Sequence, residues 1–148
     1  MTVRDLMTVD PVCVQTTDPL QHAAERMRRH DVGIVCVLAG GRLVGVLTDR
    51  DLTVRAGALD WRFSEHPCGD VMTPDPITIS PDADVLEAAE LVGQHRVRRL
   101  PVMEGERLVG IISAADLADY ASYFLRGLLA EESKAEKAGE PERPAIPA

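Results

Sequence analysis

Two short stretches place a hydroxyl side chain three residues ahead of an aspartate, directly after an apolar run. Thr48 and Asp51 follow Gly-Val-Leu, and Ser113 and Asp116 follow Gly-Ile-Ile. If each run is a strand that turns into a helix at the hydroxyl residue, the helix N-terminus offers free N–H groups and a positive dipole end, which favour phosphate. An ionised aspartate accepts hydrogen bonds from both hydroxyls of a ribose. The two stretches, here called the first and second corners, are therefore candidate nucleotide-binding elements.

The same spacing also has a purely structural interpretation. A hydroxyl residue and an acidic residue three positions later form the capping box of many helices. As four-residue motifs alone, the corners at 48–51 and 113–116 favour helix capping over ligand binding. The preceding apolar run and the occurrence of the motif twice shift the balance towards a binding site.

The duplication extends well beyond the corners. When the sequence is shifted by 65 positions, residues 5–52 align with 70–117 without a gap. Identical pairs run through this alignment and include Asp5/Asp70, Met7/Met72, Asp10/Asp75, Pro11/Pro76, Ala23/Ala88, Val37/Val102, Gly45/Gly110 and Asp51/Asp116. The chain is thus a first and a second repeat of one supersecondary unit, followed by a tail.

Each repeat is predicted to run strand, helix, strand, strand, helix after a short leading segment. Alternation, helical periodicity and apolar runs predict short strands at 12–14 and 77–79, helices at 19–30 and 84–95, and hairpin strands at 34–38, 43–47, 100–103 and 108–112. Asp18 and Asp84 are the predicted N-caps of the first helices. A unit of this size cannot bury its sheet alone, so we expect an α+β fold in which β-α-β-β-α units pack by pseudo-two-fold symmetry.

Two arginines distinguish the repeats. Arg98 and Arg99 lie just ahead of a buried strand in the second repeat, and the first repeat has Gly33 and Ile34 at the matching positions. The planar fork of arginine suits bidentate phosphate binding, although a solvated basic turn explains the pair equally well. We expect two non-equivalent sites, the first repeat being the weaker for phosphorylated ligands unless Arg50 or Arg55 supplies the missing charge.

Composition excludes several function classes. The net charge of −8 and the aromatic content of 3% disfavour a nucleic-acid-binding protein, which needs basic surface and stacking platforms. No apolar run is long enough to span a membrane, and the N-terminus has no signal-peptide core. Three cysteines at irregular spacing do not make a disulfide framework, so we expect a cytoplasmic protein.

These motifs together resemble a known family. Both repeats carry M-T-x-D-P, A-A-E and R-L-V-G followed by two apolar residues and [T/S]-x-x-D-L, and the second adds H-R-V-R-R-L-P-V. This pattern, from residue 3 to about 122, is similar to a pair of CBS domains, often called a Bateman module. The expected organisation is CBS domain 1 at 1–56, a linker at 57–67, and CBS domain 2 at 68–122.

The resemblance implies a regulatory ligand-binding module with no catalytic residues, no metal and no required cofactor. The short arrangement is similar to stand-alone bacterial two-CBS proteins, some of which belong to stress or hypoxia responses. Such modules bind adenosine-containing ligands, namely AMP, ADP, ATP, S-adenosylmethionine or NAD, in clefts between the two domains. The ligand-binding positions of the family map onto Thr48, Asp51, Arg98, Arg99, Ser113 and Asp116.

The chain continues beyond the second repeat. An apolar stripe predicts that the last helix extends over 123–132. The stripe consists of Leu117, Tyr120, Phe124, Leu125, Leu128 and Leu129. Monomers rarely expose such a stripe, so we expect a homodimer of the kind common in the family, unless the helix folds back on its own module. Residues 133–148 combine charge with proline and no apolar pattern, and we expect them to be disordered.

Two other functions remain open from the sequence. A CBS scaffold that has lost its ligand would dimerise and bind a partner protein, and the missing arginine of the first repeat favours this alternative. An enzyme or metal protein would have to use His66 and Cys68, which lack the paired spacing of a structural zinc site. Cys13 and Cys36 lie among valines and are interpreted as small core residues.

Overall fold

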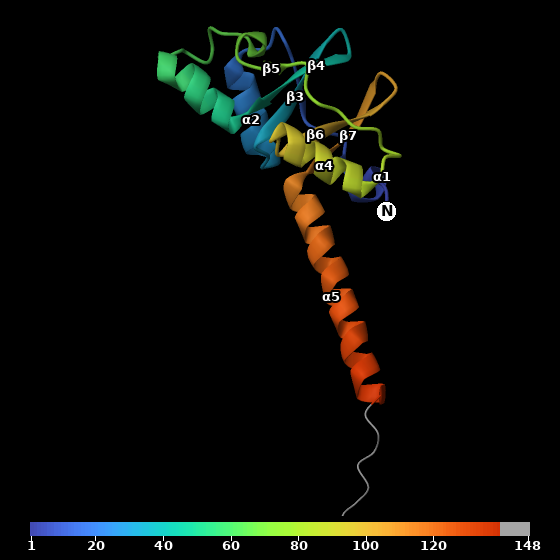
Figure 1. Cartoon of the computed structure of the whole chain (residues 1–148). Coiled ribbons are helices and arrows are strands. Elements are labelled where there is room, and N and C mark those ends of the chain that lie inside the picture. The colour runs from blue at the N-terminus through green and yellow to red at the C-terminus, as the bar shows by residue number, and fades with distance from the viewer. Residues whose placement is uncertain (140–148) are drawn as a thin grey trace, which may run out of the picture.

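The computed structural model describes residues 1–139, which form the expected α+β fold of two packed repeats (Figure 1). The first repeat contains α1 (Val3–Leu6), β1 (Thr8–Val9), β2 (Cys13–Gln15), α2 (Leu20–His30), β3 (Ile34–Ala39), β4 (Arg42–Thr48) and α3 (Asp49–Asp51), which continues through the short helical turns η1 (Leu52–Ala56) and η2 (Gly57–Leu59). The second contains the turn η3 (Cys68–Asp70), β5 (Thr73–Pro74), α4 (Val85–His95), β6 (Arg99–Glu104), β7 (Arg107–Ser113) and α5 (Ala114–Gly139).

The central hairpins of the two repeats match in detail. β3 pairs with β4 and β6 pairs with β7, both antiparallel. Each pairing has one irregularity, between Val37 and Leu38 in the first repeat and between Val102 and Met103 in the second. These positions are 65 residues apart, so the internal symmetry predicted from the sequence extends to the strand register.

The strands form two sheets, and each sheet takes an edge strand from the other repeat. One sheet has the order β1-β7-β6, and the other has the order β2-β3-β4-β5. β1 from the start of the chain pairs with β7 of the second repeat, and β5 pairs with β4 of the first. The leading segments, residues 1–9 and 66–74, are therefore exchanged reciprocally between the repeats.

Backbone hydrogen bonds hold the exchanged segments at equivalent places. The Val3 N–H donates to the Ala83 carbonyl at 2.9 Å, and the Cys68 N–H donates to the Asp18 carbonyl at 2.8 Å. Each donor and each acceptor of the first bond lies 65 residues from its counterpart in the second. The exchange thus follows the same pseudo-two-fold symmetry as the hairpins.

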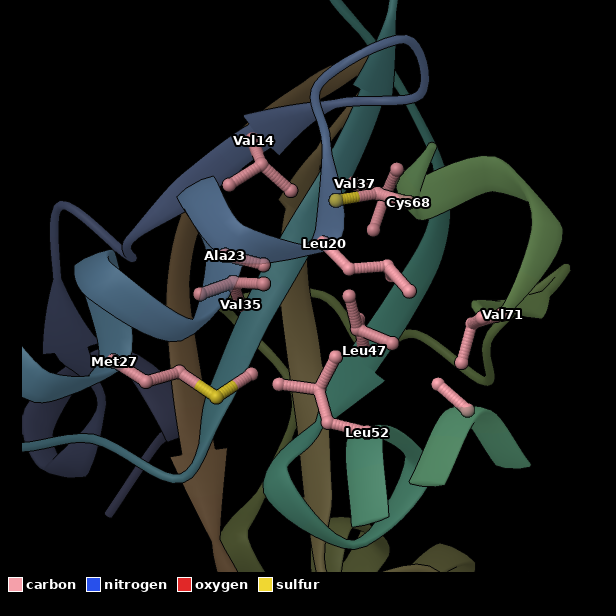
Figure 2. Close-up of a cluster of buried hydrophobic side chains, with 11 residues drawn as sticks. Val14, Leu20, Ala23, Met27, Val35, Val37, Leu47, Leu52, Cys68 and Val71 are labelled. Carbon is pink, nitrogen blue, oxygen red and sulfur yellow. The ribbon is translucent and has the colours of Figure 1, made fainter. Parts of the chain in front are cut away.

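The exchange also completes both hydrophobic cores. In the core of the first repeat, Cys68 and Val71 from the second leading segment lie beside Leu20 and Leu47 (Figure 2). In the second core, Val3 from the first leading segment is fully buried with the side chains of that repeat. Neither core is complete from its own repeat alone.

Two glycines make room for the exchanged strands. A Cβ added at Gly45 would lie 2.5 Å from the Met72 Sδ and 2.9 Å from the Thr73 carbonyl oxygen. At Gly110 the corresponding distances would be 2.6 Å to the Met7 Sδ and 2.9 Å to the Thr8 carbonyl oxygen. Any larger residue would push the exchanged backbone away from the sheet.

The prediction that Asp18 caps the first long helix is wrong. Pro19 occupies the N-cap position of α2 without a side-chain cap, and the Asp18 Oδ2 accepts from the Gln15 N–H at 2.7 Å. The free N–H of Leu20 instead donates to the His66 carbonyl at 2.9 Å, so the chain between the repeats caps this helix. Asp84 caps α4 as predicted, accepting from the Leu86 N–H at 2.8 Å.

The expected disorder from residue 133 onwards is wrong for the part that the structure describes. α5 continues through Gly139 and projects away from the two sheets (Figure 1). Glutamate, lysine and alanine are good helix formers, and extending a helix that has already nucleated costs little. The rest of the predicted tail, 140–148, lies outside the described residues.

Gly45, which lies against the exchanged strand β5, gives a test of stability. We expect Gly45→Ala to lower the free energy of unfolding by about 1–3 kcal/mol, because the added methyl group overlaps Met72 and the Thr73 carbonyl. Gly93→Ala, in an open position of α4, is the control and should raise stability by up to about 1 kcal/mol. Urea unfolding of both variants measures the difference, and equal stabilities would contradict the close approach of β5.

Candidate functional site

A cleft of about 340 Å³ lies between the first corner and the second repeat. It is lined by Ile34, Val46, Thr48, Asp49, Arg50, Asp51, Thr73, Arg96, Val97, Arg98 and Arg99. The residues from Ile34 to Asp51 come from the hairpin and corner of the first repeat. Arg96, Val97 and Arg98 join α4 to β6, and Arg99 begins β6. Thr73 comes from the exchanged strand β5. The cleft therefore depends on both repeats and on the exchange between them.

Both corners are built as capping boxes. In the first, the Asp51 Oδ2 accepts from the Thr48 N–H at 2.9 Å, and the Thr48 Oγ1 accepts from the Asp51 N–H at 3.1 Å. In the second, the Asp116 Oδ2 accepts from the Ser113 N–H at 2.8 Å, and the Ser113 Oγ accepts from the Asp116 N–H at 3.1 Å. The capping interpretation of the sequence is confirmed at both corners.

Capping occupies only one oxygen of the Asp51 carboxylate. The other oxygen, Oδ1, lies 3.7 Å from the Arg55 Nε, and the aspartate side chain is 16% exposed. The same arginine donates from Nη1 to the Val71 carbonyl at 3.0 Å, which ties the corner to the exchanged leading segment. A carboxylate has about four acceptor positions, so Asp51 can cap its helix and accept from a ligand together.

The charged groups around the cleft favour an anion. Four arginines and two aspartates line it, which gives a formal charge of +2 in a chain whose net charge is −8. A concave surface with an excess of positive charge attracts anions. Guanidinium groups bind phosphate through paired hydrogen bonds, so the cleft is chemically suited to a phosphorylated ligand.

The structure groups four of the six predicted site residues. Thr48, Asp51, Arg98 and Arg99 line the cleft, whereas Ser113 and Asp116 are not among its lining residues. The sequence predicted that the first corner would be the weaker site for phosphorylated ligands, because its own repeat has Gly33 and Ile34 at the places of Arg98 and Arg99. Packing of the repeats instead brings the arginines of the second repeat to the corner of the first.

The backbone of the two arginines still belongs to the second corner. Arg99 pairs with Ser113 across β6 and β7, and the Arg98 carbonyl accepts from the Ala114 N–H at 2.8 Å. The segment that carries these arginines therefore connects the first corner, through the cleft, with the backbone of the second corner.

Sequence reasoning missed Arg96 and Thr73. Arg96 ends α4 in the left-handed region, with φ of 53°, and Asp31 has the same conformation at the end of α2. An arginine at a helix end that normally favours glycine is a signal that could have drawn attention to Arg96. Thr73 belongs to the second M-T-x-D-P motif, but its place in the cleft follows from the strand exchange and not from the motif.

The fold and cleft define a pair of CBS domains. The sequence model of the CBS domain matches residues 3–56 and 68–123, and the chain belongs to this family. The CBS domain-containing protein YhcV of Bacillus subtilis is 37% identical over 116 residues, which cover 78% of this chain and 82% of that protein. Hypoxic response protein 1 of Mycobacterium tuberculosis is 34% identical over 118 residues, covering 79% and 82%.

Solved structures show the same architecture. Hypoxic Response Protein I, whose crystal structure has two coordinated zinc ions, aligns with a TM-score of 0.73 and 33% identity over 80% of this chain and 98% of that one. The protein CBSX2, solved in complex with AMP, aligns with a TM-score of 0.71 and 24% identity over 82% and 97%. The second similarity concerns the fold alone.

Two further features bear on the other function classes. Residues 1–139 contain no helix that is both long enough and apolar enough to cross a bilayer. Within the same range, no three side chains from histidine, cysteine, aspartate and glutamate gather as a metal-binding group. His66 instead stacks on Trp61, with ring centroids 4.0 Å apart.

The second corner allows the capping role to be measured separately. We expect Asp116→Ala to lower the free energy of unfolding by about 0.5–2 kcal/mol, because the Ser113 N–H loses its acceptor. Asp119→Ala, an exposed position on the same helix, should change stability by less than about 0.5 kcal/mol. Thermal and urea unfolding compare the two, and a neutral Asp116→Ala would show that the box contributes nothing to folding.

Proposed function

We propose that this chain is a regulatory module that binds an adenine mononucleotide in the cleft between its two CBS domains. The observation that carries the proposal is the meeting of the first corner with the arginines of the second repeat. Asp51 offers acceptor positions for a ribose, and Arg96, Arg98 and Arg99 offer donors for phosphate. Ile34, Val46 and Val97 supply apolar surface suited to a base.

The charge and size of the cleft narrow the ligand class. S-adenosylmethionine has a cationic sulfonium and no phosphate, so a cleft with formal charge +2 disfavours it. The volume of about 340 Å³ is at the lower end of the usual range for small-molecule sites, which favours AMP, ADP or ATP over NAD. The AMP complex of a protein with the same fold supports the same class.

Binding would act as a signal because the ligand touches both repeats. Its ribose would contact the corner of the first repeat, and its phosphates would contact the segment that joins α4 to β6. A ligand shifts a conformational equilibrium only by its difference in affinity for the two states. A nucleotide that bridges the repeats favours the arrangement in which they are closely packed, and a partner protein would respond to that shift.

The binding site is tested by substituting the aspartate of each corner separately. We expect Asp51→Ala to weaken ADP binding at least tenfold, or about 1.4 kcal/mol, because the ribose loses its acceptor. Asp116→Ala removes the equivalent cap outside the cleft and should leave ADP affinity within about twofold, or about 0.4 kcal/mol. Isothermal titration with AMP, ADP, ATP, S-adenosylmethionine and NADH measures both effects.

Three outcomes would contradict the proposal. Equal losses of ADP affinity in the two variants would mean that the two aspartates act only by stabilising the fold. Binding that depends on Asp116 and not on Asp51 would move the site to the second corner. If none of the five compounds binds the unaltered protein, the module is a scaffold that acts without a nucleotide.

A second, compatible function rests on the exposed face of α5. Five large side chains there are roughly half to four-fifths exposed, and they are Tyr123, Phe124, Leu125, Leu128 and Leu129. A groove of about 370 Å³ between α4 and α5 adjoins this face, and Phe124 lines it together with Leu86. We propose that two copies of the chain bury these surfaces against each other as a two-fold homodimer.

The dimer is tested by a charge on the apolar face. We expect Leu125→Asp to weaken self-association at least tenfold, because the carboxylate would have to be desolvated in the interface. Leu59→Asp is the control. Leu59 is 61% exposed, close to the 57% of Leu125, but it lies on η2 and not on α5. Sedimentation equilibrium measures both, and an unaltered chain that is monomeric at all concentrations would exclude the dimer.

A further inference from the structure

Two of the three cysteines are direct neighbours in the sheet of the first repeat. Cys13 on β2 and Cys36 on β3 are register partners in a parallel pairing, and the Cys36 N–H donates to the Val12 carbonyl at 2.9 Å. Registered residues on adjacent strands point their side chains to the same face. Adjacent strands lie about 4.7–4.9 Å apart, within the range of Cα separations that a disulfide can span, about 4.4–6.8 Å.

The two thiols lie on the sheet face that forms the floor of the cleft. Cys36 pairs with Val46 across β3 and β4, and Ile34 two residues earlier pairs with Thr48. Val46, Ile34 and Thr48 all line the cleft. Because side chains alternate along a strand, Cys36 shares their face, and Cys13 shares it too.

The two thiols differ in access and in acidity. Cys13 is partly exposed on the edge strand β2, whereas Cys36 is fully buried. The pKa of Cys13 is lowered because the neighbouring Cys36 thiol can donate a hydrogen bond to the Cys13 thiolate, and the charge of Arg26 adds to this against the effect of burial. The pKa of Cys36 is raised by that same hydrogen bond and by burial. In its thiol form, the Cys13 Sγ donates to the Pro11 carbonyl at 3.2 Å. A partly exposed, activated thiol beside a buried one is the arrangement of redox-reactive pairs.

We propose that Cys13 and Cys36 form a hydroperoxide-sensitive thiol pair that closes to a reversible disulfide within one chain. The Cys13 thiolate attacks one oxygen of the hydroperoxide, and the O–O bond breaks. The sulfur is oxidised to a sulfenic acid, and the other oxygen leaves as hydroxide or alkoxide, which becomes water or an alcohol by taking up the proton that the Cys13 thiol released on ionising.

The second step forms the disulfide. The Cys36 sulfur attacks the Cys13 sulfur, the S–O bond breaks, and the hydroxyl leaves as water with the Cys36 proton. In total the two thiols lose two hydrogens and one hydroperoxide is reduced. The bond would fasten the short edge strand β2 to the strand that forms the cleft floor.

Cys68 is an internal control for this chemistry. It is fully buried in the core of the first repeat, and burial raises its pKa to about 11. Its sulfur lies 3.7 Å from the Pro19 carbonyl oxygen, and it has no strand partner that is a cysteine within the described residues. A thiol in this setting is expected to react slowly.

The test uses the full chain in its unaltered form. Reduced protein is exposed to graded hydrogen peroxide, free thiols are alkylated, and digested peptides are analysed by mass spectrometry. We expect a linked peptide pair containing Cys13 and Cys36 that has lost two hydrogens and is restored by dithiothreitol. Cys68 should escape oxidation, and so still be alkylated, at peroxide levels at least tenfold higher. Since no substitution is involved, the result does not depend on whether a variant folds.

Single substitutions then assign the roles of the two sulfurs. Cys36→Ala should leave a sulfenic acid on Cys13 that dimedone traps, Cys13→Ala should leave Cys36 reduced, and Cys68→Ala should not change the linkage. Oxidation of Cys68 at the same rate as Cys13 would overturn the proposal. So would disulfides formed only between two chains, or sulfenic acid on Cys13 of the unaltered protein that never links to Cys36.

Discussion

The reciprocal exchange of the leading segments is the constraint on which the rest of the structure depends. Each sheet takes its last strand, and each core takes part of its side chains, from the other repeat. Gly45 and Gly110 permit the exchange because a side chain at either position would overlap the crossing backbone. Neither repeat can therefore unfold without uncovering the core of its partner, and the two repeats should fold as one cooperative unit.

The first corner shows how one carboxylate can serve folding and recognition together. The Asp51 Oδ2 closes the capping box, while the Oδ1 faces Arg55, which in turn holds the exchanged segment through the Val71 carbonyl. The capping and binding interpretations of this motif are thus not exclusive. A group that is fixed by its own helix is already oriented for a ligand, which reduces the entropy lost on binding.

Duplication followed by divergence has left the two repeats with unequal chemistry. The second repeat contributes Arg98 and Arg99 to a cleft whose aspartates belong to the first, and Gly33 and Ile34 stand at the matching positions of the first repeat. The first repeat alone has the Cys13 and Cys36 pair, since Thr78 and Pro101 stand at the matching positions of the second. A symmetric scaffold can thereby hold different sites on its two sides.

The sequence by itself determined the duplication, the hairpins, the long helices and both capping boxes, because each of these depends on neighbouring residues and on local periodicity. It also indicated Thr48, Asp51, Arg98 and Arg99 as residues of chemical interest. It could not show that Arg98 and Arg99 meet the first corner instead of the second, or that Thr73 joins them in the cleft. These contacts arise between segments far apart in the chain. The packing of the repeats and the exchange of β1 and β5 decided which side chains share a cleft. Local patterns specify elements, and only the burial of the two cores specifies which elements meet.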